Sequence, residues 1–397
     1  MTGQVRTTSE PEMERVHRLH RDTPVVDGMV MMDDLFFYRD DMLSLALDMD
    51  KRGSSPFDIF DEIHRQQTEA LIGRPDLRRA CRAHFEKAGV TAISITLGDL
   101  TAQWPGPEKA VRDLASWTRR FDECSDLFVK VKRTEDIRLA HRTGRVAIIL
   151  NFQDLTYIEG DLDKLNFFHS LGIRIAQPTY NNQNLLGSGC TERVDSGLSH
   201  FGVEAIHRMN ELGIAVDLSH SGRATTADAI SVSRRPVICS HVGVRALTDN
   251  PRNKTDDQLR AVADTGGYIG ICTLPLFLAP RGRARLDDFL NHLEHAIEVV
   301  GVDHVGVGTD WFGSDVPSGL QAILDKATDS PGLGLRGDPE FAYSMSMKVE
   351  GAEGWSDWPN LTRGMIARGY SDDDIRKILG ENFLRVMGTI WDNPGPH

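Results

Sequence analysis

Residues 213–241 read GIAVDLSHSGRATTADAISVSRRPVICSH, and the dipeptide Ser-His closes each of two short apolar runs. The runs, 214–218 and 236–239, have the length of strands that are buried on both faces. The segment between them is long enough for a helix that crosses back over a sheet, which makes the strands parallel neighbours. We therefore expect His220 and His241 side by side at the carboxyl edge of the sheet, where α/β folds carry their chemistry.

Composition limits the classes of protein to consider. The chain has 397 residues, and its net charge of −13 argues against a nucleic-acid partner. Its five cysteines are scattered without Cys-x-x-Cys spacing, which is typical of reduced thiols. No apolar run reaches the roughly 20 residues that span a bilayer, and the N-terminal segment lacks the apolar core of a signal peptide. We expect a cytoplasmic protein without a membrane partner.

The rest of the chain repeats the pattern of a strand followed by a helix. Eight apolar runs have strand length: 24–29, 89–97, 145–152, 172–178, 214–218, 236–239, 268–272 and 304–308. This alternation predicts an α/β fold, a (β/α)8 barrel of the TIM type, with residues 1–397 as a single domain. Residues 12–22 predict a short polar helix with His17 and His20 on its surface, and 314–356 predict an insertion after the eighth strand.

On such a barrel, the residues at the carboxyl ends of the strands face one pocket. These residues are Met29, Met31, Gln153, Tyr180, His220, His241 and Asp310. Two imidazoles suit a borderline metal, and a carboxylate such as Asp310 can orient or deprotonate a bound water. The arrangement is that of the amidohydrolase superfamily. Taken singly, each histidine is more typical of a core residue that caps a strand, and Asp310 is equally typical of a helix cap or a loop carboxylate.

Motifs over nearly the whole chain resemble those of the renal or membrane dipeptidases, which are metallopeptidases of that superfamily. They are PVVDG at 24–28, GLSHFGVEAIHRMNELGIAVDLSHSG at 197–222, PVICSHVGVRALTDNPRN at 236–253, HVGVGTD at 304–310 and RGYSDDDIRKILGENFLRV at 368–386. The resemblance implies that His220 and His241 bind a metal. It further implies that Arg252 binds the substrate carboxylate and that Asp310 lies near the metal-bound water and the substrate amine.

The chain departs from the family at the other metal ligands. Family members carry His-x-Asp directly after the first-strand Asp-Gly, where this chain has Met29-Val30-Met31. The bridging Glu at the end of the third strand is Gln153 here. Both anionic ligands are therefore missing, and a thioether is a poor substitute for them at a zinc site. We predict that the two-metal site is absent, leaving at most one Zn²⁺ on His220 and His241, or a metal-free site.

Three functions remain open. The first is a hydrolase of an amide or dipeptide-like substrate, in which Asp310 takes the proton of the water and Arg252 holds a carboxylate. The second is a metal-independent lyase or isomerase that uses His220, His241 and Asp310 as acid–base groups beside Gln153. The third is a catalytically inactive homologue that binds a carboxylate.

All three functions imply a small-molecule ligand with a carboxylate, which Tyr180, Met29 and Met31 are expected to contact. The methionines favour an apolar or aromatic ligand. Tyr180 is equally compatible with a loop residue whose hydroxyl bonds to backbone. The insertion at 314–356, which has tryptophans at its edges, is expected to be a lid or the contact of a homodimer.

Overall fold

The computed structural model describes residues 10–30, 40–100, 105–280, 283–311, 322–323, 326 and 348–392. The strands within them are β1 (Val26–Val30), β2 (Ala92–Thr96), β3 (Phe128–Lys130), β4 (Val146–Phe152), β5 (Ile173–Ala176), β6 (Ala215–Val216), β7 (Ile238–Val242), β8 (Tyr268–Ile271) and β9 (Val305–Val307). Their side chains are buried almost throughout, as expected for strands covered on both faces.

Helices connect the strands and cover them. The α-helices are α1 (Glu10–Asp22), α2 (Asp40–Lys51), α3 (Pro56–Gly73), α4 (Pro75–Ala88), α5 (Glu108–Glu123), α6 (Thr134–Thr143), α7 (Asp163–Leu171), α8 (His200–Leu212), α9 (Arg223–Val232), α10 (Asp256–Asp264), α11 (Pro275–Leu278), α12 (Leu286–Val300), α14 (Trp358–Ala367), α15 (Asp372–Arg376) and α16 (Asn382–Trp391). Short 3₁₀ turns are η1 (Thr156–Ile158), η3 (Val302–His304) and η6 (Trp355–Asp357), and η7 (Lys377–Glu381) is a π-helical turn. No described helix combines the length and the apolar composition needed to cross a membrane.

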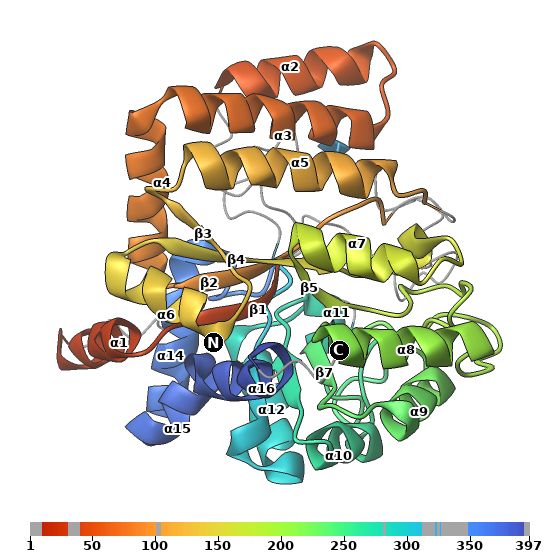
Figure 1. The fold of residues 1–397 in the computed structure, drawn as a ribbon. Coiled ribbons are helices and arrows are strands. Elements are labelled where there is room, and N and C mark those ends of the chain that lie inside the picture. Colours follow the sequence, from red (N-terminus) through yellow and green to blue (C-terminus); the bar gives the residue numbers. More distant parts are fainter. Residues whose placement is uncertain are drawn as a thin grey trace.

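The strands form an α/β fold in which every ladder between the named strands is parallel. One curled sheet has the order β1-β2-β4-β5-β6, with β3 paired to β4, and a second has the order β7-β8-β9. Single bridges join the two sheets on either side, from Asp217 to Ile238 and from Val30 to Trp311. Helices α2, α3 and α5 are stacked above the strands, with α8, α9 and α10 below them on the right (Figure 1).

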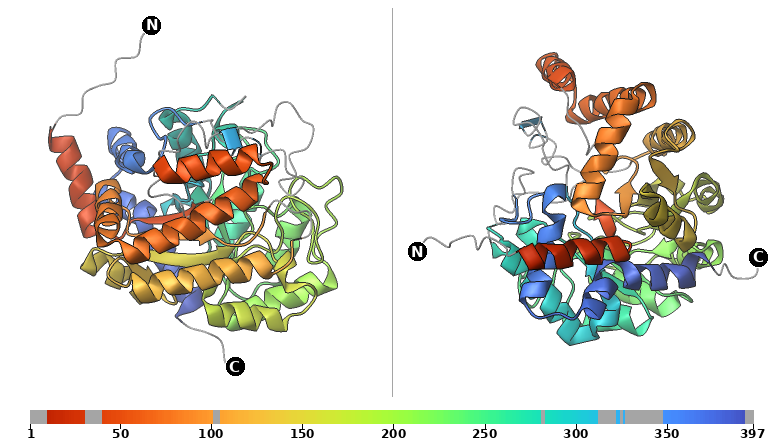
Figure 2. Two further views of the ribbon diagram at one scale, coloured as in Figure 1. Left: turned by 90° about the horizontal axis from the view of Figure 1, so that it is seen from above. Right: turned by 90° about the vertical axis from the view of Figure 1, so that its left-hand side faces the viewer.

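The two sheets approach each other closely inside the fold. A Cβ atom at Gly28 of β1 would lie 3.1 Å from the carbonyl oxygen of Ser240 in β7. A Cβ at Gly270 of β8 or at Gly308 after β9 would collide with that same oxygen. Three glycines therefore leave the room that the Ser240 carbonyl occupies. Viewed from two further directions, the helices surround the strands, and α2 and α3 project from this layer (Figure 2).

The structure contains a strand at each of the eight predicted places, and it adds β3. That strand has three residues and pairs only with β4, so it is too short to show a pattern in the sequence. Strand β7 extends through His241 to Val242, beyond the predicted end.

The prediction for His20 is wrong, whereas His17 is exposed as expected. His20 is 7% exposed, because α1 packs against α14 and places Nε2 of His20 2.7 Å from Oγ1 of Thr362. Burial lowers the pKa of His20 to about 4.

The tryptophans near the predicted insertion are part of the core. Trp311, Trp355 and Trp358 are buried, and the rings of Trp311 and Trp355 meet edge to face at 6.1 Å. Most of 314–356 lies outside the described residues.

Replacing Gly308 by alanine should lower the free energy of unfolding by about 1–3 kcal/mol, because the new methyl group displaces the Ser240 carbonyl. Denaturant unfolding followed by circular dichroism measures this loss. Gly73→Ala at the end of α3 is the matched control, since nothing lies within 4 Å of its Cβ. Equal stability of the two variants would show that the strands do not crowd around Ser240.

Candidate active site

The two Ser-His dipeptides are tied together by one buried carboxylate, that of Asp217. Its Oδ1 accepts hydrogen bonds from the hydroxyl of Ser219 at 2.6 Å and from the backbone N–H groups of Ser219 and Ser240, each at 3.0 Å. Its Oδ2 accepts from the hydroxyl of Ser240. Burial raises the pKa of Asp217, and the four donors oppose that shift. The repeated serine is thus explained by the shared carboxylate between the strands.

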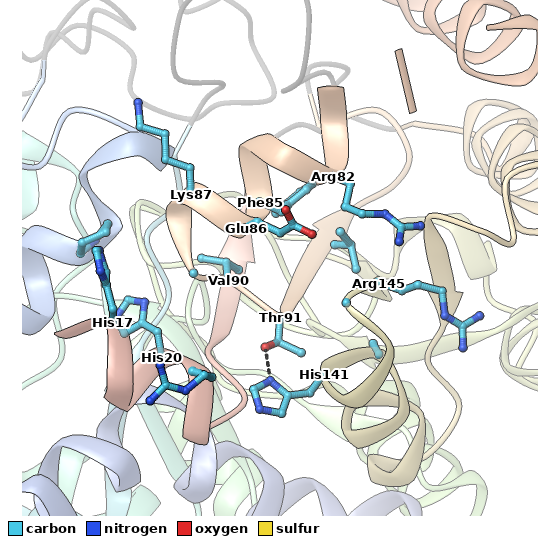
Figure 3. A pocket seen from close by; sticks show the side chains of 16 residues that line it. His17, His20, Arg82, Phe85, Glu86, Lys87, Val90, Thr91, His141 and Arg145 are labelled. Carbon is cyan, nitrogen blue, oxygen red and sulfur yellow. Dashed lines mark hydrogen bonds between the residues drawn. The ribbon is translucent and has the colours of Figure 1, made fainter. Parts of the chain in front are cut away.

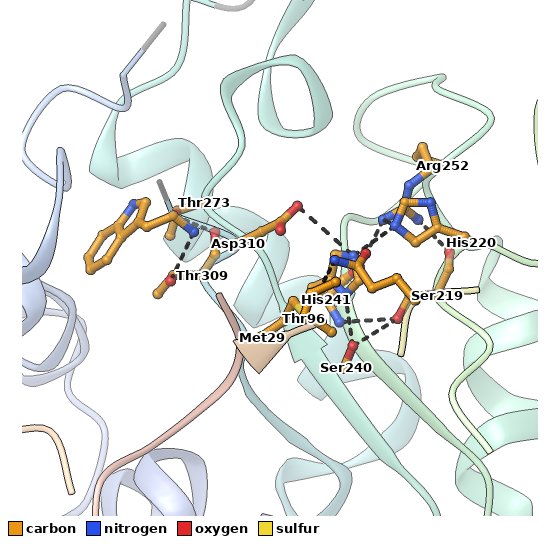
Figure 4. A network of polar contacts seen from close by, with 12 residues as sticks. Met29, Thr96, Ser219, His220, Ser240, His241, Arg252, Thr273, Thr309 and Asp310 are labelled. Atoms are coloured by element: carbon orange, nitrogen blue, oxygen red, sulfur yellow. Dashed lines mark hydrogen bonds and ion pairs between the residues drawn. The ribbon is translucent and has the colours of Figure 1, made fainter. Parts of the chain in front are cut away.

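The hydrogen-bond network assigns the same tautomer to both histidines. Nδ1 of His220 donates to Oδ1 of Asn181 at 2.7 Å. Nδ1 of His241 donates to the Ser240 hydroxyl oxygen at 2.7 Å, because the proton of that hydroxyl is directed to Asp217. In their neutral forms both rings are therefore left with an unprotonated Nε2, and these two atoms face each other at 3.0 Å (Figure 4).

A ring and a guanidinium surround His220. The phenol ring of Tyr180 stacks on the imidazole with centroids 4.0 Å apart and an interplanar angle of 24°. Nη2 of Arg252 lies 3.1 Å from Nε2 of His220, while its Nη1 donates to the Ser219 carbonyl. Burial, and then the charge of Arg252, lower the pKa values of His220 and His241 well below their ordinary range. Both histidines are therefore neutral at physiological pH.

Asp310 is held in an unusual backbone conformation beside this pair. Its φ angle is 58°, in the left-handed region that costs about 1 kcal/mol for residues other than glycine. The preceding Thr309 donates to the Asp27 carboxylate through both its backbone N–H, at 2.8 Å, and its hydroxyl, at 2.7 Å. The N–H of Asp310 donates to the Met29 carbonyl at 2.9 Å. These contacts hold the strained residue in place, and such strain is frequent at active sites.

The side chain of Asp310 lies close to His241, and one of its oxygens lacks a hydrogen-bond partner. Its Oδ2 lies 3.9 Å from Nε2 of His241, and its Oδ1 is buried with no hydrogen-bond partner. Burial raises the pKa of this carboxyl to about 8, although the Arg252 guanidinium opposes the shift. A carboxyl group with this pKa can exchange a proton near neutral pH.

Gln153 and Met29 lie in a separate polar network at the ends of β1, β2 and β4. The Nε2 of Gln153 donates to Oγ1 of Thr96 at 2.7 Å, and Oγ1 of Thr96 lies 3.3 Å from Sδ of Met29. Met31 lies outside the described residues. The structure thus brings His220, His241, Arg252, Tyr180 and Asp310 into one cluster, and Gln153 and Met29 into a neighbouring one.

Several supporting residues were missed by the sequence analysis. Asp217, Asn181 and Asp27 orient the histidines and Asp310, and Gln177 accepts the His220 N–H at 3.2 Å through Oε1. Each of them follows a buried strand or lies within one. In the sequence, a polar residue at such a position was the pattern that could have indicated its role in the site. Asp217 was the easiest of them to predict from the sequence, since it lies inside the repeated motif itself.

A cavity of about 480 Å³ lies at the end of the strands opposite to the cluster around His220 (Figure 3). Its walls come from α1, α4 and α6 and from the starts of β2 and β4. Its two buried or half-buried imidazoles bond to protein, His20 to Thr362 and His141 to Thr91. None of the residues that line it carries a buried polar atom without a partner. The cluster around His220 is therefore the better candidate for an active site.

A family model for membrane dipeptidases, peptidase family M19, matches residues 13–328 and 332–393. The chain belongs to the membrane dipeptidase family. An uncharacterized dipeptidase of Schizosaccharomyces pombe is 34% identical over 67% of the chain, which spans 56% of that protein. The dipeptidase tcpJ of Claviceps purpurea is 28% identical over 82% of the chain and 72% of its own length.

Solved structures of other dipeptidases and amidohydrolases have a similar fold. An amidohydrolase from Pseudomonas aeruginosa has a TM-score of 0.72 and 28% identity, covering 95% of this chain and 99% of its own. A metallopeptidase from Rhodobacter sphaeroides, bound to a phosphinate mimic of L-Ala-D-Ala, has a TM-score of 0.68 and 21% identity, covering 93% of this chain and 99% of its own. At that identity the second likeness concerns the fold alone.

Members of the membrane dipeptidase family are metallopeptidases, and the chemistry of the residues present decides whether a metal fits here. Two unprotonated Nε2 atoms at 3.0 Å repel each other unless a cation or a proton lies between them, and their Nδ1 atoms carry the hydrogen bonds that orient metal-binding imidazoles. His220 and His241 therefore fit one metal ion. Within the described part of the neighbouring cluster, Gln153 and Met29 offer a second ion no charged ligand. Among the described residues, no group of three or more His, Cys, Asp or Glu side chains is arranged to hold a metal.

The raised pKa of Asp310 predicts how stability depends on pH. Between pH 3.8 and about 8, folded metal-free protein keeps a proton that the unfolded chain has released, so a rise in pH destabilises the fold. Asp310→Asn cannot ionise. The free energy of unfolding of the Asp310→Asn variant, minus that of the wild type, should therefore rise across this interval by up to about 1.4 kcal/mol per pH unit.

Urea unfolding from pH 4 to pH 9 measures this difference. Asp257→Asn, at a side chain that is 82% exposed, is the control and should show no comparable trend. A flat profile for Asp310→Asn would mean that Asp310 is not the buried, weakly acidic group described here.

Proposed function

We propose that this protein is a hydrolase that cleaves an amide or dipeptide-like substrate with a free carboxylate, using at most one metal ion. The observation that carries the proposal is the pair of facing Nε2 atoms of His220 and His241, with Asp310 beside them. Membership of the membrane dipeptidase family supports the reaction type. A bound metal such as Zn²⁺ would polarise the scissile carbonyl and acidify a water.

The chain's own residues account for binding and proton transfer. Arg252 is 1% exposed, and its Nε has no partner although its Nη atoms bond to protein. The Nε2 of Gln177 is a second buried donor without a partner. These two donors suit a substrate carboxylate, because a buried carboxylate needs charge-assisted hydrogen bonds. Asp310, once ionised, accepts the proton of the attacking water and returns it to the leaving amine.

We also propose that the two sheets act as one (β/α)8 barrel. Support comes from the bridges from Asp217 to Ile238 and from Val30 to Trp311, and from the approach of Gly28 in β1 to Ser240 in β7. A closed barrel directs the carboxyl ends of its strands into a single pocket. His220, His241 and Asp310 follow or occupy such ends, on β6, β7 and β9.

A metal-free acid–base enzyme is the second candidate. The observation that favours it is Gln153, a neutral amide where the resemblance implies a bridging glutamate, beside the Met29 thioether where it implies a histidine. Under this reading Asp310 and the histidines exchange protons with the substrate directly, as in a lyase or an isomerase.

Zinc stoichiometry separates the two candidates. Protein purified without added metal and dialysed against zinc should retain about one equivalent, and His220→Ala should lose it because one of two nitrogen ligands is gone. Elemental analysis of the dialysed protein gives the ratio. His295→Ala on α12, whose imidazole bonds to Asp256 instead, should keep the zinc. Zero equivalents, with turnover that ignores chelator, would favour the metal-free enzyme.

Restoring the family's ligands should create a second site. The variant that combines Met29→His, Met31→Asp and Gln153→Glu should bind two equivalents of zinc, since it regains two carboxylates. It should also lose most native turnover, because a neutral pocket becomes charged. Bound metal, dipeptide hydrolysis and native turnover are measured side by side. Native turnover that survives unchanged would show that these residues take no part in the reaction.

A further inference from the structure

Met29 and Gln153, which stand where the resemblance implies metal ligands, belong to an uncharged cluster that we call the neutral corner. It consists of Met29, Ser94, Thr96, Asn151 and Gln153, at the ends of β1, β2 and β4. All except Thr96 are 0% exposed. A group that enters this corner therefore leaves water and depends on these five side chains for its hydrogen bonds.

The hydrogen bonds of the neutral corner run in one direction. Nδ2 of Asn151 donates to Oγ of Ser94 at 2.9 Å, and Oγ1 of Thr96 donates to Oδ1 of Asn151 at 3.1 Å. Since the Thr96 hydroxyl has a single proton, its oxygen accepts from Nε2 of Gln153, at 2.7 Å. This order fixes the Gln153 amide and leaves its Oε1 as a buried acceptor without a partner. Such an acceptor is suited to an N–H or O–H group of a ligand.

The neutral corner offers no charge to a cation. Two neighbouring strand-end carboxylates are already occupied: Asp27 accepts from Thr309 and Trp358, and Asp154 accepts from Thr156 and Asn184. Asp310 follows β9, which lies on the far side of β1 from β2 and β4. A substrate ammonium buried in the corner would find no free carboxylate among the described residues of β1, β2 and β4, and burying an unpaired charge costs far more than burying a neutral amide.

We propose that the substrate is an N-acylated amino acid, and that its uncharged acyl side occupies the neutral corner. This inference rests on the proposed hydrolase function. The acyl group packs against the Met29 thioether, and the scissile amide N–H donates to Oε1 of Gln153. Hydrolysis then adds water across the C–N bond: the acyl carbon gains the hydroxyl group, the amine nitrogen gains the proton, and a carboxylic acid and an amino acid leave.

Two ligands that differ at one group test the proposal. Isobutyryl-alanine and alanyl-alanine share the amide and the carboxylate, and a methyl group in the first replaces the ammonium of the second. Calorimetric titration of the full chain at pH 7, metal-free and zinc-loaded, should give at least about tenfold tighter binding of isobutyryl-alanine. Gln153→Glu, which has nearly the same shape but adds a charge, should shift the ratio of affinities toward alanyl-alanine by about tenfold or more.

Two further variants make the result specific. Gln66→Glu makes the same exchange on α3, where the Gln66 amide donates to Glu62, and should leave the ratio unchanged. Gln153→Met removes the acceptor without adding a charge, so it should weaken isobutyryl-alanine at least about fivefold. It also serves if the glutamate variant does not fold.

The outcomes separate this inference from the proposed function. Equal or tighter binding of alanyl-alanine by the wild type would overturn the inference and leave a hydrolase of ordinary dipeptides. Unchanged affinity for isobutyryl-alanine in Gln153→Met would also overturn it. Binding of neither ligand, with no hydrolysis of either, would overturn the proposed function itself.

Discussion

The carboxylate of Asp217 is the contact on which the geometry of the site depends. It lies where β6 ends and β7 begins, and it binds the backbone and the hydroxyl group of both serines. A buried carboxylate is costly unless its oxygens are fully bonded, so the four donors stabilise it and are themselves fixed by it. Since the Ser240 hydroxyl then accepts from His241, the orientation of one imidazole follows directly from this carboxylate.

Two other buried carboxylates are likewise held by several hydrogen-bond donors. Asp27 is buried and bonded to Thr309, Trp358 and the backbone of Met29, and burial still raises its pKa to about 6. Asp154 is buried and bonded to Thr156 and to the backbone of Tyr180. These saturated carboxylates position other residues. Asp310 differs, because one of its oxygens has no partner and its neighbour is an imidazole.

Charge is distributed unevenly over the site. Arg252, Asp310 and the two imidazoles lie toward β6, β7 and β9, whereas the ends of β1, β2 and β4 carry Met29, Thr96, Asn151 and Gln153. The family to which the chain belongs is one of metallopeptidases, and among the described residues the histidine side carries two nitrogen ligands for an ion. A substrate that spans both sides therefore meets a charged half and a neutral half. In the proposals above, the chemistry lies in the first half and the choice of substrate in the second.

The sequence by itself determined the strand and helix order and the pairing of the two Ser-His dipeptides, because buried parallel strands read as short apolar runs and crossovers force neighbouring ends together. It also determined that Met29 and Gln153 are uncharged, since charge is a property of the residue alone. Only the tertiary structure decided the tautomers of His220 and His241. They depend on Asn181 and Asp217, and the contact of His220 with Asn181 crosses from one strand end to the next. The burial of polar side chains also depends on the tertiary structure, because an isolated sequence does not reveal what packs over them. His20 and Asp310, whose pKa values are shifted by burial, are examples.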